Sequence, residues 1–184
     1  MPCYKATFCL MCVVMVVSCE ATNKSAVGPP AGSDELVEYS IPMKRLFDDE
    51  FGGVGFATPL SDSATDESQL LSRRALTAGN IVLCTVDTLT EGFIDDSKAT
   101  TVEFRVPCRS LGGSATTPFQ KLSIPSNSYS YSILRQSGAS LTGKSVVIFV
   151  RYFSEYGQTT RHWHIEPVGP GILEMVQRLR GPLN

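Results

Sequence analysis

The sequence predicts a mostly β domain in which five or six short strands form a small closed barrel or a sandwich. From residue 81 onward, β-branched and apolar residues dominate the chain. They form short runs that are separated by turn residues such as Gly112-Gly113 and Pro125. Helical patterns flank this region instead of alternating with its strands, so βαβ units with a parallel sheet are not expected.

Each expected strand is a short apolar or alternating run. Residues 100–108 alternate most clearly, with Val102 and Phe104 on one face and Glu103 on the other. Residues 145–153 form the most apolar run, which predicts the most buried strand. The expected strands cover residues 81–89, 100–108, 119–124, 128–134, 145–153 and 161–168, with a further short strand over residues 35–41.

Two short helices are expected beside the strands. Ser63 starts the first one, Asp66 suits its first turn and Gly79 ends it, which predicts a helix over residues 66–77. Near the C-terminus, apolar residues recur at helical spacing over residues 171–180. This spacing predicts an amphipathic helix that packs on the barrel or sheet.

The N-terminal segment predicts export. Lys5 precedes twelve residues without a charge, and a run of that length is too short to cross a bilayer. This pattern is typical of a secretory signal peptide. We therefore expect a signal peptide over residues 1–18, a flexible tether over residues 19–34 and a single β-rich domain over residues 35–184, with a barrel core at about residues 78–170.

The end of the signal, Val16-Val17-Ser18-Cys19, resembles the lipobox of bacterial lipoproteins. The resemblance implies that Cys19 carries a lipid and anchors the mature chain to the membrane of the cell envelope. The polar stretch that follows suits a tether, because it holds too little apolar surface to offset its ordering entropy. The alternative is ordinary cleavage nearby, for instance after Ala21, which makes the protein a secreted one.

Composition limits the classes of partner. The chain has 16 basic and 18 acidic residues and no basic cluster, so nucleic acid is not an expected partner. No second apolar stretch is long enough to span a membrane. We expect no cofactor, and contact with the membrane through the lipid anchor alone.

Cysteine usage predicts one disulfide bond in the folded part. Cys84 and Cys108 remain after the signal and the lipid candidate are set aside, an even number in an oxidising compartment. If the strands around a polar loop at residues 90–100 pair antiparallel, residues whose numbers sum to about 192 lie opposite each other. That register places Cys84 opposite Cys108. It also places Val86 opposite Val106, and Thr88 opposite Phe104. The alternative is a pair of buried free thiols.

Several segments resemble small OB-like barrels of the netrin-module and metalloproteinase-inhibitor type. They are residues 76–86, 101–106, 110–113, 141–150 and 162–169, which follow one another in the order of that fold. The resemblance implies an OB-like barrel. It does not carry the inhibitory function over, because that function needs a free N-terminal cysteine held by several disulfides, and only Cys84 and Cys108 remain here.

His162 and His164 are the strongest candidates for chemistry. In a strand they share one face, where two imidazoles can share a metal ion if a carboxylate such as Glu155, Glu166 or Asp87 adds a third ligand. The favoured interpretation places Trp163 in the core and both histidines in solvent, with no metal site. The acidic run at residues 48–50 is likewise interpreted as a solvated turn rather than a cation site.

No pattern in the sequence predicts catalytic residues. There is no G-x-S-x-G elbow, and the only two histidines lie on one strand. Tyr129, Tyr131, Tyr152 and Tyr156 either line a groove or stand on an ordinary half-exposed sheet face. The sequence therefore favours a non-catalytic envelope lipoprotein that binds a protein or glycan partner. The alternative is a metal-binding protein or metal-dependent enzyme that uses His162 and His164.

Overall fold

The computed structural model describes residues 36–52, 64–94, 96–113, 120–169 and 171–181. The expected signal peptide, the tether and Cys19 lie outside these residues. The division into residues 1–18, 19–34 and 35–184 therefore stays a prediction.

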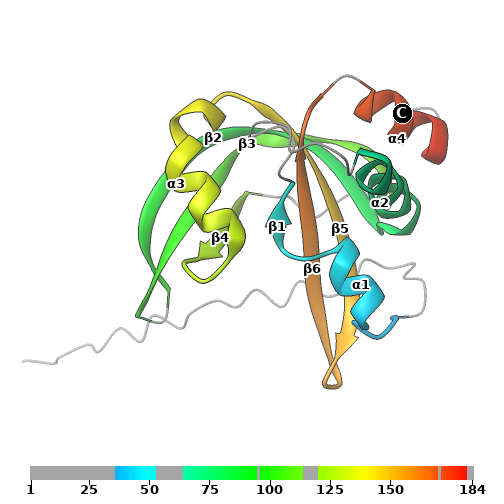
Figure 1. The fold of residues 1–184 in the computed structure, drawn as a ribbon, viewed down its shortest axis with the longest axis horizontal. Coiled ribbons are helices and arrows are strands. Elements are labelled where there is room, and N and C mark those ends of the chain that lie inside the picture. Colours follow the sequence, from blue (N-terminus) through cyan, green and yellow to red (C-terminus); the bar gives the residue numbers. More distant parts are fainter. Residues whose placement is uncertain (1–35, 53–63, 95, 114–119, 170, 182–184) are drawn as a thin grey trace, which may run out of the picture.

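The fold is built on one curled, six-stranded sheet with the order β1-β6-β5-β2-β3-β4 (Figure 1). Neighbouring strands pair antiparallel, except that β1 pairs parallel with β6. The sheet keeps two edges, β1 and β4, so it forms a half-barrel that is compatible with an OB-like fold. The strands are β1 (Glu50–Phe51), β2 (Asn80–Ile94), β3 (Ser97–Gly113), β4 (Lys121–Pro125), β5 (Ser145–Glu155) and β6 (Gln158–Pro167).

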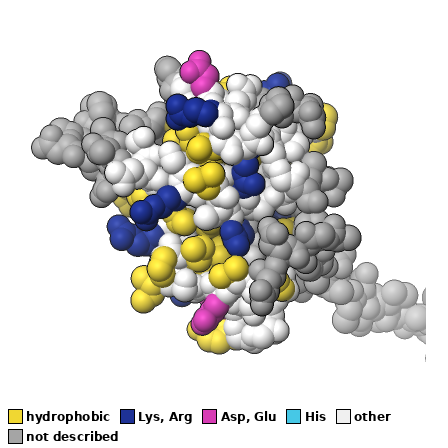
Figure 2. Space-filling view, turned by 90° about the vertical axis from the view of Figure 1, so that its right-hand side faces the viewer, with side chains coloured by type: hydrophobic (Ala, Val, Ile, Leu, Met, Phe, Trp, Pro, Cys, Tyr) yellow, Lys and Arg dark blue, Asp and Glu magenta, His cyan; other side chains and the backbone are white. Residues whose placement is uncertain are grey.

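Helices cover both faces of the sheet. α3 (Tyr129–Leu141) contacts β1, β2, β3 and β4, so it lies in the opening between the two edge strands. α1 (Ile41–Leu46), α2 (Ala64–Thr77) and α4 (Ile172–Arg180) lie on the other side of the molecule, which faces the viewer in Figure 2. The prediction of a mostly β, barrel-like domain with one helix before it and one at the C-terminus is confirmed. Among the described residues, no helix combines the length and the apolar character needed to cross a bilayer.

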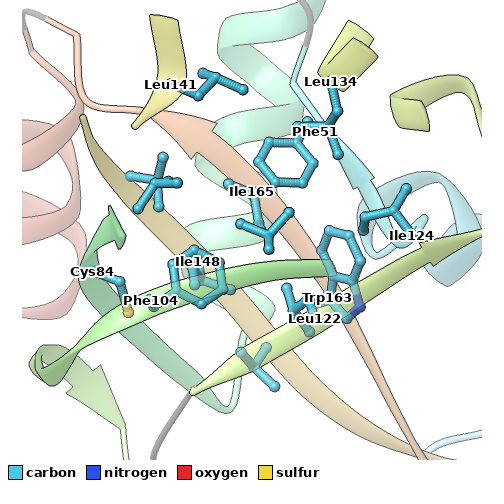
Figure 3. Packing of buried hydrophobic residues seen from close by; sticks show 14 residues of the cluster. Phe51, Cys84, Phe104, Leu122, Ile124, Leu134, Leu141, Ile148, Trp163 and Ile165 are labelled. Atoms are coloured by element: carbon cyan, nitrogen blue, oxygen red, sulfur yellow. The ribbon is translucent and has the colours of Figure 1, made fainter. Parts of the chain in front are cut away.

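The core consists of two apolar clusters, one on each face of the sheet. Trp163 and Phe104 belong to the cluster beneath α3 (Figure 3), and Phe149 belongs to the cluster beneath α1, α2 and α4. β5 supplies both clusters from alternate residues, because its side chains point to opposite faces. The prediction that this strand is the most buried one agrees with its five consecutive buried residues, Val146–Val150.

The predicted strand over residues 128–134 is wrong, because this segment forms the first half of α3. Ser128 caps the helix, since its side chain accepts a hydrogen bond from the backbone N–H of Tyr131 at 3.1 Å. Ile133, Leu134 and Leu141 are buried at helical spacing. Over a run this short, alternation of apolar residues does not distinguish a strand from a helix.

The hairpin of β2 and β3 is longer than predicted. The described residues of the expected loop, 90–94 and 96–100, are strand except for Asp96, which forms a turn and has a left-handed φ of 63°. Two of the expected pairs are wrong: Val86 lies opposite Phe104, and Thr88 lies opposite Glu103. β-bulges between Leu83 and Thr85, and again between Val86 and Thr88, shift the register.

The predicted cysteine pair is nevertheless brought together. Leu83 pairs with Arg109, the register expected from the sequence, and the sulfur atoms of Cys84 and Cys108 lie at disulfide distance, 2.04 Å apart. Cys84 is buried in the cluster beneath α3. The bridge therefore joins β2 to β3 at the base of their long hairpin.

The segment before α1 also differs from prediction. In place of the strand expected over residues 35–41, the described residues before Ile41 make only an isolated bridge, Glu38 to Ser154, and the chain then enters α1, which the sequence pattern does not predict. Pro42 starts this helix, where a missing N–H is tolerated. The predicted helices over residues 66–77 and 171–180 are present as α2 and α4.

We predict that thiol titration of the unfolded, unreduced protein finds neither Cys84 nor Cys108 free. The two cysteines are 24 positions apart in the sequence, and replacing both by serine should lower the free energy of unfolding by roughly 3 kcal/mol. Chemical denaturation of the double variant beside the wild type measures this loss. Two free thiols in the unreduced wild type would contradict the bridge.

Candidate functional site

His162 and His164 lie on one face of β6, and Trp163 points to the opposite face, into the core. This part of the prediction is confirmed. The expectation that both histidines face solvent is wrong, since His164 is only 3 % exposed and the side chain of His162 only 13 %. The turn that holds Asp48 and Asp49 covers both rings.

Two carboxylates enclose the imidazole of His164. Its Nδ1 lies 2.6 Å from Oδ1 of Asp48, and its Nε2 lies 2.9 Å from Oε1 of Glu166. Burial by itself lowers the pKa of His164, but the hydrogen bonds to Asp48 and Glu166 outweigh burial and raise the pKa above its ordinary value. The ring therefore keeps its proton to higher pH than a free histidine, and in that protonated form it donates one N–H group to each carboxylate.

Arg74 of α2 completes this ionic cluster. Its Nη1 donates to Oε1 of Glu166 at 3.3 Å, and its Nη2 lies 3.7 Å from Oδ2 of Asp48. The same side chain, 7 % exposed, donates from Nε to the backbone carbonyl of Leu46 at 2.8 Å. The two carboxylates thus face the guanidinium of Arg74 and the imidazole of His164, and protonation of the imidazole gives the balance that buried charges require.

His162 has a separate set of contacts. Its Nδ1 lies 2.7 Å from Oδ2 of Asp49, and its ring stacks on Tyr39 with centroids 3.6 Å apart. Oδ1 of Asp49 accepts the backbone N–H of Trp163 at 2.9 Å. Nε2 of His162 faces Glu155 at 3.5 Å. Asp49 therefore ties the turn to β6 through both of its oxygens.

The histidine contacts favour ion pairing over metal binding. Both ring nitrogens of His164 face carboxylate oxygens at hydrogen-bond distance, where a metal ion would have to stand between them. Of the possible third ligands, Glu155 and Glu166 touch the histidines directly, whereas Asp87 pairs with Arg105. Among the described residues, no group of three histidine, cysteine or acidic side chains is arranged to hold a metal ion.

A groove lies between α1 and α2, directly outside the ionic cluster. It has a volume of about 490 Å³, within the range of about 300–1,000 Å³ that is common for ligand sites. Aliphatic side chains of both helices line it, and Arg45 and Arg73 stand among them. Its described lining residues are Ile41, Pro42, Met43, Arg45, Leu46, Gln69, Leu70, Arg73 and Thr77.

The ionic cluster holds the two helices that form the walls of this groove. The Arg74 side chain donates to the carbonyls of Leu46 and, from Nη2 at 3.4 Å, of Arg45, so it binds the carbonyl end of α1. The helix that carries Arg74 is itself the second wall of the groove. The buried arginine therefore sets how α1 and α2 stand relative to each other.

The other candidates from the sequence lie elsewhere in the structure. Tyr129 and Tyr131 belong to α3, while Tyr152 and Tyr156 belong to the hairpin of β5 and β6, so the four do not form one groove (Figure 1). Tyr131 lines a shallower hollow beside the β2–β3 hairpin with Phe93, Lys98 and Arg135. Cys84 and Cys108 belong to the cluster beneath α3, on the opposite side of the sheet from the groove.

Sequence reasoning missed the groove and the cluster beneath it. α1 was not predicted, and the acidic run was interpreted as a solvated turn although its carboxylates hold both histidines. One signal was available, because Arg74 falls on the same helical face as Leu70 and Leu71, a position for a buried side chain.

Comparison with known proteins adds no relative: no protein-family model, no curated protein and no solved structure matches this chain.

We predict that the folded protein loses stability as the pH rises above about 6.5, the ordinary histidine value. The pKa of His164 is raised in the folded state, so the contribution of its proton is fully present below the unfolded value. The contribution is lost as the pH rises through the folded value. The free energy of unfolding should fall by no more than roughly 1.4 kcal/mol per pH unit, which corresponds to the release of one proton.

Denaturation midpoints between pH 6 and pH 9 measure this effect. His164→Gln should flatten the slope, whereas His162→Gln, a change of the other histidine on the same face, should keep it. A slope that survives in His164→Gln would show that another group is responsible.

Proposed function

We propose that this protein is an exported envelope lipoprotein whose folded domain is a non-catalytic binding module, and that the groove between α1 and α2 receives a protein partner. One observation carries the proposal. The groove exposes apolar side chains of two helices, above all Ile41, which is 78 % exposed. Exposed apolar surface of this kind is typical of interaction sites.

The lining favours a protein over a glycan. Sugar rings stack on aromatic side chains and need several hydrogen-bonding groups, whereas the described lining holds no aromatic ring. Aliphatic walls with charged groups at the rim suit a helix or an extended segment that inserts apolar side chains. A protein partner therefore fits the chemistry of this groove better.

Export and the lipid anchor are parts of the same proposal. A disulfide pair at Cys84 and Cys108 suits an oxidising compartment. The lipobox-like residues 16–19 and the polar stretch behind them supply an anchor and a tether that present the groove to partners in the envelope. The likeness to netrin-type barrels belongs to the proposal as a likeness of fold, without any inhibitory function.

We predict that Cys19→Ala abolishes lipid labelling in a bacterial host that processes lipoproteins. The thiol is the lipid attachment point, so its loss should also leave the precursor uncleaved. Labelling with a fatty-acid analogue and intact-mass analysis measure both effects. A wild-type mature chain that starts at Glu20 or Thr22 without added lipid mass would contradict the anchor.

We also predict that a photo-cross-linking amino acid at position 41 captures a protein partner in the native envelope. The same amino acid at position 76 is the matched control, because Leu76 of α2 is 57 % exposed but does not line the groove. Partner adducts should form from position 41 and not from position 76. Equal adducts from both positions, or none from position 41, would contradict a partner in the groove.

A further inference from the structure

The groove carries two arginines whose charges no other part of the described structure balances. Arg45 of α1 and Arg73 of α2 are both exposed and both line the groove. Within the part of the chain that the structure describes, neither guanidinium forms a hydrogen bond or an ion pair. No acidic side chain stands among the described lining residues.

Neighbouring arginines behave differently. Arg74 is buried in the ionic cluster, Arg151 donates to the carbonyl of Thr77, and Arg180 donates to the carbonyls of Ala75 and Ala78. These three side chains bind the structure together, whereas Arg45 and Arg73 point their charges at an open hollow. Among the described residues, nothing therefore competes with a ligand for these two side chains.

This local excess of positive charge contrasts with the net negative charge of the whole chain. The whole sequence is acidic, with a net charge of −2, yet the side of the molecule with α1, α2 and α4 shows basic and apolar side chains along its middle (Figure 2). The acidic side chains that are coloured in that view stand near its upper and lower edges. A positively charged patch on an acidic protein favours a negatively charged partner.

The apolar part of the lining further limits the chemical class of partner that fits the groove. Ile41, Met43 and Leu70 come from the two facing helices, so an inserted side chain would touch apolar atoms on both sides. A purely charged ligand, such as an inorganic anion, leaves these contacts unused. The groove therefore suits a ligand that combines apolar side chains with carboxylates.

We propose that the groove binds an acidic amphipathic segment of its protein partner, an inference that rests on the proposed function. Apolar side chains of the segment insert between Ile41 and Leu70, and its aspartate or glutamate carboxylates pair with Arg45 and Arg73. Guanidinium groups bind carboxylates through two parallel hydrogen bonds, which gives such a contact both strength and orientation.

The test uses the purified full mature chain and a phage library of random short peptides as the probe. Peptides enriched on the wild type should combine aspartate or glutamate with aliphatic or aromatic residues. The double variant Arg45→Glu, Arg73→Glu should bind these peptides at least about tenfold more weakly. It should instead bind versions of these peptides in which lysine replaces each acidic residue, since the charges are then exchanged on both the protein and the peptide.

The matched control is Arg178→Glu together with Lys44→Glu, which changes the net charge equally at exposed positions outside the groove lining. These changes should leave peptide affinity within about threefold. Enrichment of basic or neutral peptides, no enrichment at all, or an equal loss in the control would overturn the proposal. So would binding of phosphatidylglycerol vesicles or heparin in place of peptides, because these are other anionic partners.

Failure of the acidic segment and failure of the proposed function give different results. If position 41 still captures a protein in the envelope while the charge exchange changes nothing, the groove binds a protein and the acidic segment is wrong. If position 41 captures none, the proposed function itself fails.

Discussion

The buried ionic cluster around Arg74 is the interaction on which the arrangement of this molecule depends. It joins three segments that are far apart in the sequence: Asp48 follows α1, Arg74 belongs to α2, and His164 and Glu166 belong to β6. Removing water from four ionisable groups is unfavourable unless each charge finds a partner. Loss of one partner in such a cluster typically costs about 3–5 kcal/mol, because the remaining charge stays buried.

The three consecutive acidic residues after α1 each bind a different part of the molecule. Asp48 holds His164, Asp49 holds His162, and Glu50 accepts the first backbone N–H groups of α3 at 3.0 and 2.7 Å. A carboxylate at a helix N-terminus satisfies donors that lack partners within the helix. The turn thus connects the N-terminal segment to both sides of the sheet, and Gly52 completes it, since a Cβ there would collide with the carboxylate of Glu166.

The groove is a consequence of this arrangement. α1 has six residues, and a helix of that length is not stable in isolation. It persists because Leu46 and Phe47 are buried and because Arg74 binds the carbonyl end of the helix. A short helix held at its C-terminal end leaves its N-terminal residues, including Ile41, exposed beside α2. Apolar surface and two guanidinium groups without a partner among the described residues then line the same hollow.

Much of the fold could be predicted because its signals are local. The apolar run of β5, the alternation in β3 and the capped pattern of α2 each extend over enough residues to distinguish strand from helix. The partner of Cys84 followed from the antiparallel hairpin. The sequence predicts a strand in place of α3 because residues 128–134 fit the spacing of a strand as well as that of a helix. The contact that decides for a helix is made by Glu50 at the N-terminus of α3, which lies 79 and 80 residues away in the sequence from the two N–H groups it accepts.

The sequence by itself determined the class of the fold, the two faces of β6 and the cysteine pair, since each depends on residue spacing within one element or one hairpin. Only the tertiary structure decided that His164 lies buried between two carboxylates, that Asp48 is its partner across 116 residues, and that Arg45 and Arg73 share a groove. Spacing along the chain carries no information on such pairs. Their contacts are formed only when packing of the two cores brings α1, α2 and β6 together.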